Sequence, residues 1–347
     1  MGLAMPLPID GAVNTLRASA EHRGADERFH DRMREMQALL AADLAEVEEA
    51  LAEAAQDGTA PATLAAMHLV SLGGKRARPL TMLLSTACFG TIPPWARQLA
   101  VVAELVHSGT LLHDDVIDEG MERRGAATAR RLWGNAMSVI AGDLLLVHGL
   151  ERTLKYAPEA MPDLLVALRQ LINGEVLQLR CRTELDLTEA TYEAIVRDKT
   201  ASLFVWATRT GARLGGANLE EQDWMAGFGE HIGMAFQLVD DVLDYVGEGT
   251  GKTLLADLRE GKVTLPLVLA VRRAPELLDQ VQRLHAGQEV AIEDISHVVI
   301  ESGACDEVRE RATHATLRAL ESLRHVPPSP ARLLLEQVAE ELGSRVL

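Results

Sequence analysis

The chain has 347 residues, of which 34 are Lys or Arg and 51 are Asp or Glu, so its formal net charge is −17. This acidity argues against proteins that bind nucleic-acid phosphates or anionic membrane surfaces through basic patches, so no nucleic-acid partner is expected. Hydrophobic residues make up 48% of the sequence, which predicts a globular protein with a substantial core rather than a disordered chain.

After a leader at residues 1–28, which we expect to be flexible, apolar residues recur every three or four positions almost throughout. This spacing predicts helices. Their expected ranges are 29–56, 59–72, 94–119, 136–156, 161–182, 188–214, 219–246, 262–285, 289–303, 305–325 and 329–345. Alternation with period two is missing, which disfavours sheets. We predict an all-α fold, one domain at 29–347 with ten or more helices, in which the apolar stretches 99–112 and 139–147 are central.

The three cysteines, Cys88, Cys181 and Cys305, lie far apart and form no Cys-x-x-Cys pair. Neither a disulfide framework nor a zinc site is therefore expected, and a reducing cytoplasm fits this usage. The N-terminal residues lack the basic and apolar pattern of a secretory signal. No run of about 18 uninterrupted apolar residues is present, so no integral membrane segment is predicted.

The sequence HDDVIDEG at 113–120 ends a long apolar helix and places three carboxylates on its last turn. Asp114 and Asp118 are four residues apart, and Asp115 and Asp118 three apart, so their β-carbons lie within about 5–6 Å. Like charges repel, and the C-terminal end of a helix disfavours anions. Mg²⁺ is a natural compensating cation, because it binds carboxylates together with substrate phosphates. A solvated acidic turn is the alternative for this cluster taken alone.

A second cluster, DDVLD at 240–244, repeats this spacing with Asp240, Asp241 and Asp244 at the end of another apolar helix. Two such clusters at matching helical positions indicate two halves of a metal-bridged anion site. Cations that could complement it occur in small groups, namely Lys75, Arg76 and Arg78 after a glycine pair, Arg123 and Arg124 after the first cluster, and Lys199, Lys252 and Lys262. For any single lysine, ordinary surface charge is the alternative interpretation.

Two other motifs are rejected. The sequence GTGKT at 249–253 is similar to the end of a P-loop, but Val246 stands where the leading glycine is required and no strand is predicted before it. His113 beside Asp114 is similar to an HD-type metallophosphohydrolase motif, but no further His/Asp set at ligand spacing accompanies it.

Seven ordered motifs extend this pattern over roughly residues 35–345. They are GGKRARP at 73–79, ELVHSGTLLHDDVIDEGMERRG at 104–125, GNAMSVIAGDLLL at 134–146, GEVLQL at 174–179, KTASLF at 199–204, FQLVDDVLD at 236–244 and DLREGKVTLPL at 257–267. The chain thereby resembles the trans-isoprenyl diphosphate synthases, or polyprenyl synthetases. The resemblance implies a helical bundle around a central cavity, and a head-to-tail condensation of isopentenyl diphosphate with an allylic diphosphate that releases pyrophosphate.

The resemblance also implies roles for the matching residues. The metal-binding residues would be Asp114, Asp115, Asp118, Asp240, Asp241 and Asp244. Asp114 and Asp118 would hold two Mg²⁺ ions on the allylic diphosphate, and chiefly Asp240, with Asp244 behind it, would hold a third. The allylic diphosphate would be bound by Arg123, Lys199, Lys252 and Lys262. Isopentenyl diphosphate would be bound by Lys75, Arg78, His107 and Arg124. The developing cation would lie near Thr200 and Gln237.

The sequence around two of these residues bears on their assignment. A core histidine is the alternative for His107, which lies two helical turns before Asp114. The sequence between Tyr245 and Asp257 departs from the family pattern after its lysine, so Lys262 is a stronger candidate than Lys252.

Product length would be set one helical turn, about 5.4 Å, before Asp114. Gly109 and Thr110 lie there, and Val106 and Ala103 lie one turn further. Short-chain family members carry an aromatic residue at this level, which this sequence lacks. We expect a product of geranylgeranyl length or longer, with hexa- to nonaprenyl favoured, from a farnesyl or geranylgeranyl diphosphate primer. Alternatively, a bulky residue of a neighbouring helix, such as Met137 or Leu171, closes the pocket.

Two alternative functions remain. A class I terpene cyclase on the same fold is disfavoured, because the Gly-Gly-Lys sequence at 73–75 and the second aspartate cluster are both present. A non-catalytic subunit of a heteromeric synthase is disfavoured by the intact aspartates. The resemblance further implies a homodimer, and the long apolar product implies transient membrane contact during its release.

Overall fold

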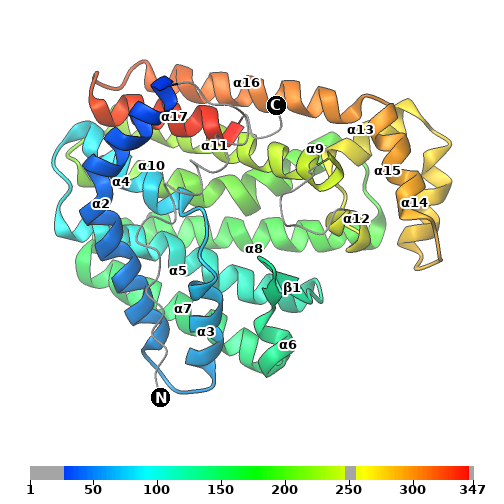
Figure 1. Ribbon diagram of the computed structural model, residues 1–347, viewed down its shortest axis with the longest axis horizontal. Coiled ribbons are helices and arrows are strands. Elements are labelled where there is room, and N and C mark those ends of the chain that lie inside the picture. The colour runs from blue at the N-terminus through cyan, green and yellow to red at the C-terminus, as the bar shows by residue number, and fades with distance from the viewer. Residues whose placement is uncertain (1–26, 247–254, 344–347) are drawn as a thin grey trace. The chain divides into compact units, whose positions relative to one another are not determined.

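The computed structural model describes residues 27–246 and 255–343, and this part of the chain is almost entirely helical (Figure 1). The all-α prediction is therefore confirmed. The chain divides into two compact units. One comprises the chain up to Leu164 with Ala207–Met225 and Val326–Val338, and the other comprises Leu165–Trp206, Ala226–His325 and the chain from Ala339. The expected leader lies outside the described residues except for its last two positions, which begin a helix. The single domain stays a prediction.

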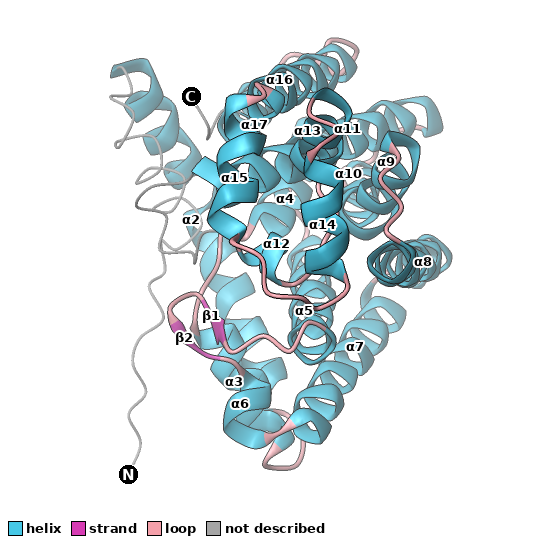
Figure 2. Cartoon of the chain, turned by 90° about the vertical axis from the view of Figure 1, so that its right-hand side faces the viewer, coloured by secondary structure: helices cyan, strands magenta, loops and turns pink. Residues whose placement is uncertain are grey.

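The first unit is organised around long helices. They are α2 (Glu27–Gln56), α3 (Ala62–Ser71), α4 (Ala77–Phe89), α5 (Pro94–Ile117), the short α6 (Ala129–Trp133) and α7 (Asn135–Tyr156), followed by the 3-10 turn η1 (Pro158–Ala160). An antiparallel ribbon of β1 (Glu122–Arg123) and β2 (Ala126–Ala127) lies between α5 and α6 in the sequence. Figure 2 shows this ribbon, in magenta, beside α3. There Nε2 of His68 lies 2.7 Å from the carbonyl oxygen of Ala127.

The second unit contains shorter helices. They are α9 (Glu189–Val196), the π-helical turn η2 (Arg197–Ala201), α12 (Ala256–Arg259), α13 (Leu265–Arg273), α14 (Leu277–His285), α15 (Ile292–Glu301) and α16 (Ala304–Leu323). Four more helices supply residues to both units, namely α8 (Met161–Glu184), α10 (Ser202–Leu214), α11 (Leu219–Val246) and α17 (Pro330–Gly343).

Helix α5 is the core of the first unit. Leu99, Val102 and Leu105 have no exposed surface, so the prediction that residues 99–112 are central is confirmed. Helix α7 packs closely against α5, because a β-carbon on Gly109 would lie only 2.9 Å from the carbonyl oxygen of Gly142.

The prediction that residues 139–147 are central is wrong for the single chain. Val139, Ile140 and Val147 of α7 are between 38% and 49% exposed. Ile140 and Val147 lie on the opposite side of α7 from Gly142, which contacts α5, so the apolar sequence alone did not locate the buried face.

Several local elements differ from the predicted ranges. Helix α4 was not predicted. Pro79 lies near its start, but a proline in the first turn does not interrupt a helix. The β1–β2 ribbon is too short for alternation to reveal it. The predicted helix 188–214 contains the π turn η2, and the predicted helix 262–285 is divided into α13 and α14 near Pro275. Helix α3 begins at Ala62 rather than at 59, after Pro61.

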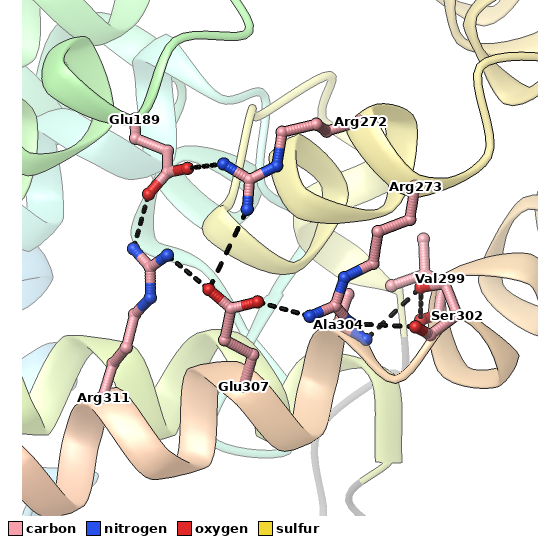
Figure 3. A network of polar contacts seen from close by, with 8 residues as sticks. All are labelled: Glu189, Arg272, Arg273, Val299, Ser302, Ala304, Glu307 and Arg311. Carbon is pink, nitrogen blue, oxygen red and sulfur yellow. Dashed lines mark hydrogen bonds and ion pairs between the residues drawn. The ribbon is translucent and has the colours of Figure 1, made fainter.

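Within the second unit, ion pairs join the ends of three helices (Figure 3). Glu189 in the first turn of α9 pairs with Arg272 of α13 and, at 2.5 Å, with Arg311 of α16. Glu307 of α16 pairs with Arg311 and with Arg273. The Arg311 guanidinium lowers the pKa of Glu189, so this carboxylate stays charged and anchors the start of α9, the helix that leads into the π turn.

Candidate active site

The first aspartate cluster occupies the C-terminal end of α5, where Asp118 is the C-cap residue. Asp115 is 2% exposed, and its Oδ1 lies 2.8 Å from both Nε and Nη2 of Arg123. Burial raises the pKa of Asp115, and the Arg123 guanidinium opposes this rise. Asp114 and Asp118 are only partly buried. The cluster thus divides into one internal carboxylate and two that are more accessible.

Contacts with α7 fix this end of α5. Oγ of Ser138 donates a hydrogen bond to the carbonyl oxygen of Leu112, 2.8 Å away. The next residue, His113, has Nε2 at 3.1 Å from the carbonyl oxygen of Val139 and at 3.3 Å from Oδ1 of Asp143. A β-carbon on Gly142 would lie 2.3 Å from the same nitrogen, so only glycine leaves room for the His113 ring.

The β1–β2 ribbon presents Arg123 and Arg124. Its two loop residues, Arg124 and Gly125, both have positive φ, as a two-residue type I′ hairpin requires. Oγ1 of Thr128 donates a 2.8 Å hydrogen bond to the carbonyl oxygen of Gly120, which closes the base of the ribbon. The turn was not predicted, because arginine is uncommon at a positive φ and its sequence carries no typical turn signal.

The sequence GGKRARP forms the junction between α3 and α4, with positive φ at Gly73, Gly74 and Arg76. Arg76 is buried, and it pairs at 2.7 Å with both Glu48 of α2 and Glu104 of α5. Burial opposes its charge, but the two glutamates raise its pKa, so Arg76 remains a cation with a structural role.

A group of cations surrounds His107 of α5. The guanidinium of Arg124 lies against Gly74, where a β-carbon would be 2.9 Å from its Nη2. Burial, together with the charges of Arg78 and Arg124, lowers the pKa of His107 well below its ordinary value. His107 is therefore neutral at physiological pH. A neutral imidazole among arginines suits a polyanion. It adds a hydrogen-bonding group without adding to the mutual repulsion of the arginine charges.

The residues assigned to product length differ in environment. Ala103, Val106 and Gly109 are buried, and Gly109 faces α7, where a β-carbon would lie 3.2 Å from Cγ of Leu146. Thr110 alone is partly exposed, and its hydroxyl donates to the carbonyl oxygen of His107. Leu146 had not been identified from the sequence.

In the second unit, Lys199 and Thr200 belong to the π turn η2. Such turns are frequent at functional sites. A β-carbon on Gly174 of α8 would lie 2.6 Å from the backbone nitrogen of Lys199, so this glycine permits α8 to approach the turn. The ammonium group of Lys199 also pairs with Glu175, the next residue of α8.

The second aspartate cluster lies in the last turns of α11. Asp241 is 2% exposed and accepts hydrogen bonds from the Tyr192 hydroxyl at 2.6 Å and from Nε2 of Gln237 at 2.8 Å. Burial, with a contribution from the charge of Asp257, raises the pKa of Asp241 to about 7. Oε1 of Gln237 in turn accepts from Thr200 at 2.9 Å.

Asp244, the last residue of this cluster, and Lys262 both contact the segment that follows α11. Asp244 accepts from the backbone nitrogens of Ala256 at 3.0 Å and Asp257 at 3.2 Å, and so fixes the start of α12. Lys262 pairs with Glu260 at 2.6 Å and with Asp257 at 3.6 Å. Lys252 lies outside the described residues.

The carboxylates suit a hard cation such as Mg²⁺, which takes oxygen ligands and retains several waters or phosphate oxygens. In the described part of the chain, no group of three or more His, Cys, Asp or Glu is arranged to hold a metal ion by itself. Oδ2 of Asp115 is buried and accepts no hydrogen bond from the described residues. A cation beside Asp114 and Asp118 would offset the negative charge of the buried Asp115 carboxylate. The residues therefore fit a metal ion whose coordination is completed by a polyanionic substrate.

The polyprenyl synthetase family model matches residues 61–301. The all-trans-nonaprenyl-diphosphate synthase (geranyl-diphosphate specific) of Rhodobacter capsulatus is 36% identical over 304 residues, which cover 86% of this chain and 93% of that protein. Heptaprenyl diphosphate synthase component 2 of Geobacillus stearothermophilus is 34% identical over 324 residues, which cover 90% and 99%.

Among solved structures, a polyprenyl synthase from Caulobacter crescentus, complexed with calcium and isoprenyl diphosphate, matches with a TM-score of 0.85 and 35% identity. The match covers 91% of this chain and 98% of that one. Within residues 27–246 and 255–343, none of the helices has the length and apolar character needed to cross a membrane.

Proposed function

The chain belongs to the polyprenyl synthetase family, and on this premise we propose that it condenses isopentenyl diphosphate head-to-tail with an allylic diphosphate, in the presence of Mg²⁺. The products are pyrophosphate and an all-trans polyprenyl diphosphate of geranylgeranyl length or longer. Farnesyl and geranylgeranyl diphosphate are the proposed primers. The assignment as a prenyl-transferring enzyme agrees with the relatives named above.

One observation carries this proposal. Helix α5 presents Asp114 and Asp118 at its end and His107, among arginines, two turns earlier. Seven residues of helix span about 10 Å. A carboxylate pair that binds metal and a separate cationic group are the two features needed to bind two diphosphates of different roles.

We assign the metal ligands to Asp114, Asp118 and Asp240, with three Mg²⁺ ions in the substrate complex. The three remaining aspartates of the clusters accept hydrogen bonds from the protein. Asp115 accepts from Arg123, Asp241 from Gln237, and Asp244 from the backbone at the start of α12. When bound, Mg²⁺ supplies Lewis-acid stabilisation of the departing pyrophosphate.

The chain's own residues perform the remaining work. The allylic diphosphate is bound by Arg123, Lys199, Lys262 and Lys252. Isopentenyl diphosphate is bound by Lys75, Arg78, Arg124 and neutral His107. Oxygen atoms of Thr200 and Gln237 stabilise the allylic cation that forms when pyrophosphate leaves, and pyrophosphate accepts the proton lost after condensation. Charge-assisted hydrogen bonds from lysine and arginine suit these anions.

A homodimer is part of the proposal. Ile140, Val147 and Leu154 of α7 recur every seven residues and are between 48% and 58% exposed, which supports a helix face covered by a second copy. Light scattering should show a dimer that the substitution Ile140→Glu converts to a monomer. The three free cysteines support a reducing compartment, and we propose the cytoplasm, with transient membrane contact during product release.

The deciding experiment incubates the purified protein with Mg²⁺, labelled isopentenyl diphosphate and either primer, and then measures product length. An elongated diphosphate that disappears when EDTA is added supports the proposal. Cyclised hydrocarbons would instead indicate a terpene cyclase. The component 2 relative makes a subunit of a two-protein synthase the second candidate. Activity that appears only on addition of a second protein favours that candidate, and no elongation under either condition contradicts both.

A further inference from the structure

Four side chains of the second unit form an unbroken chain of hydrogen bonds. Tyr192 of α9 contacts Asp241 at 2.6 Å, Asp241 contacts Gln237 at 2.8 Å, and Gln237 contacts Thr200 of the π turn at 2.9 Å. Tyr192, Asp241 and Thr200 are each less than 10% exposed. Water therefore competes little with these bonds, and their geometry is set by the protein.

The chemistry of the four groups gives this chain a direction. The Tyr192 hydroxyl donates to Oδ2 of Asp241 and Nε2 of Gln237 donates to Oδ1, so both oxygens of this side chain act as acceptors. Burial and the neighbouring Asp241 raise the pKa of Tyr192 well above its ordinary value, which keeps its proton in place. Because Nε2 of Gln237 faces Asp241, Oε1 faces Thr200 and must accept its proton.

The backbone at Thr200 is closely packed on two sides. A β-carbon on Gly174 of α8 would lie 2.6 Å from the nitrogen of Lys199, and one on Gly233 of α11 would lie 2.6 Å from Cα of Ala201. The π turn is thus held between two helices. With the backbone fixed, the remaining variable is the direction in which the Thr200 hydroxyl points its single proton.

We propose that Tyr192 and Asp241 are positioning residues, which orient Gln237 and Thr200 so that Thr200 offers oxygen lone pairs rather than a proton to the developing allylic cation. This inference rests on the proposed function. It makes Asp241 an anchor of side-chain orientation and not a metal ligand. A preoriented oxygen stabilises developing positive charge without reorganisation, whereas an outward-pointing O–H would oppose it.

The first test is Tyr192→Phe, which removes the donor at the start of the chain. We expect kcat to fall by about 10- to 100-fold, the usual effect of losing an orienting partner. The KM values for both diphosphates and the Mg²⁺ dependence should change little, because no group that binds them is altered. Tyr245→Phe is the matched control, since Tyr245 is also buried in this unit but its hydroxyl faces Thr264 at 3.4 Å. It should leave kcat within about twofold of wild type.

A double-mutant cycle decides whether Tyr192 acts through Thr200. Thr200→Val removes the hydroxyl, so Tyr192→Phe should lower kcat much less in that background, by only the part that acts through the Gln237 oxygen. Independent, multiplicative losses in the double variant would overturn the proposal, as would a Tyr192→Phe enzyme with wild-type kcat.

Two measurements do not depend on turnover. Calorimetric binding of Mg²⁺ with inorganic pyrophosphate should weaken strongly in Asp240→Asn and much less in Asp241→Asn, and equal losses would identify Asp241 as a metal ligand. In protein labelled with ¹⁵N-glutamine, the side-chain amide signal of Gln237 should shift in Tyr192→Phe but not in Tyr245→Phe. If wild type forms no elongated product, the proposed function fails, and an unshifted Gln237 signal separately overturns the orientation.

Discussion

Arg123 and Asp115 join the ribbon to the end of α5: Nε and Nη2 of Arg123 each lie 2.8 Å from one oxygen of the buried carboxylate, eight residues earlier in the chain. One aspartate of the first cluster therefore holds an arginine that we assign to the allylic diphosphate. Its sequence neighbour Asp114 lies on the more accessible side of the helix. Adjacent carboxylates thus have separable functions.

Substitution of the two aspartates should separate catalysis from stability. Asp115→Asn weakens a buried charge-assisted pair and should lower the free energy of unfolding by about 1–3 kcal/mol, measured by urea denaturation. Asp114→Asn should leave that free energy nearly unchanged but reduce the rate of elongation by orders of magnitude, because a metal ligand is lost. Near-normal turnover of Asp114→Asn would refute its assignment as a metal ligand.

Product length should respond to Thr110, the partly exposed member of the predicted pocket residues. Thr110→Phe should shorten the main product with little loss of initial rate, measured by chromatography of the labelled products. Thr110→Ser is the control, because it keeps the hydroxyl that donates to the carbonyl oxygen of His107. If Thr110→Phe leaves the length unchanged while Leu146→Ala increases it, the limit lies at Leu146 of α7.

Two features could be predicted from the sequence, the all-α class and the placement of the aspartates at the ends of helices. Both follow from the local spacing of residues along a helix. It could not separate Asp115 from Asp114, since the difference depends on Arg123, a partner beyond the helix end. The structural role of Arg76 was missed for a similar reason: Glu48 and Glu104 each lie 28 residues away.

Interruptions within helices were also hidden from the sequence. The π turn at Arg197–Ala201 preserves the apolar spacing on either side of it, so periodicity shows one continuous helix. The glycines that permit close helix approach, such as Gly142, carry no signal of their own in a single sequence. Packing partners, rather than residue type, decide their importance.

Gly142 is one such position, because the ring of His113 occupies the space of a β-carbon. Gly142→Ala should displace that ring and lower the free energy of unfolding by about 1–3 kcal/mol through overpacking. Gly149→Ala on the same helix is the matched control, since its β-carbon would meet Val102 and Val106 at an ordinary 3.6 Å. Gly149→Ala should be neutral or stabilising. Equal effects of the two substitutions, measured in urea, would contradict the packing at His113.

Stability should depend on pH through His107. Burial, together with the charges of Arg78 and Arg124, lowers the pKa of this histidine well below 6.5. Below about pH 6.5 the unfolded chain binds a proton that the native state does not, so the free energy of unfolding falls as pH decreases, by at most about 1.4 kcal/mol per pH unit. This contribution is fully present above that pH. His107→Gln should remove it, whereas His297→Gln, at an exposed position of α15, should not. Urea denaturation without Mg²⁺ between about pH 5 and 8 measures the slopes, and parallel curves for wild type and His107→Gln would show that His107 is protonated equally in both states.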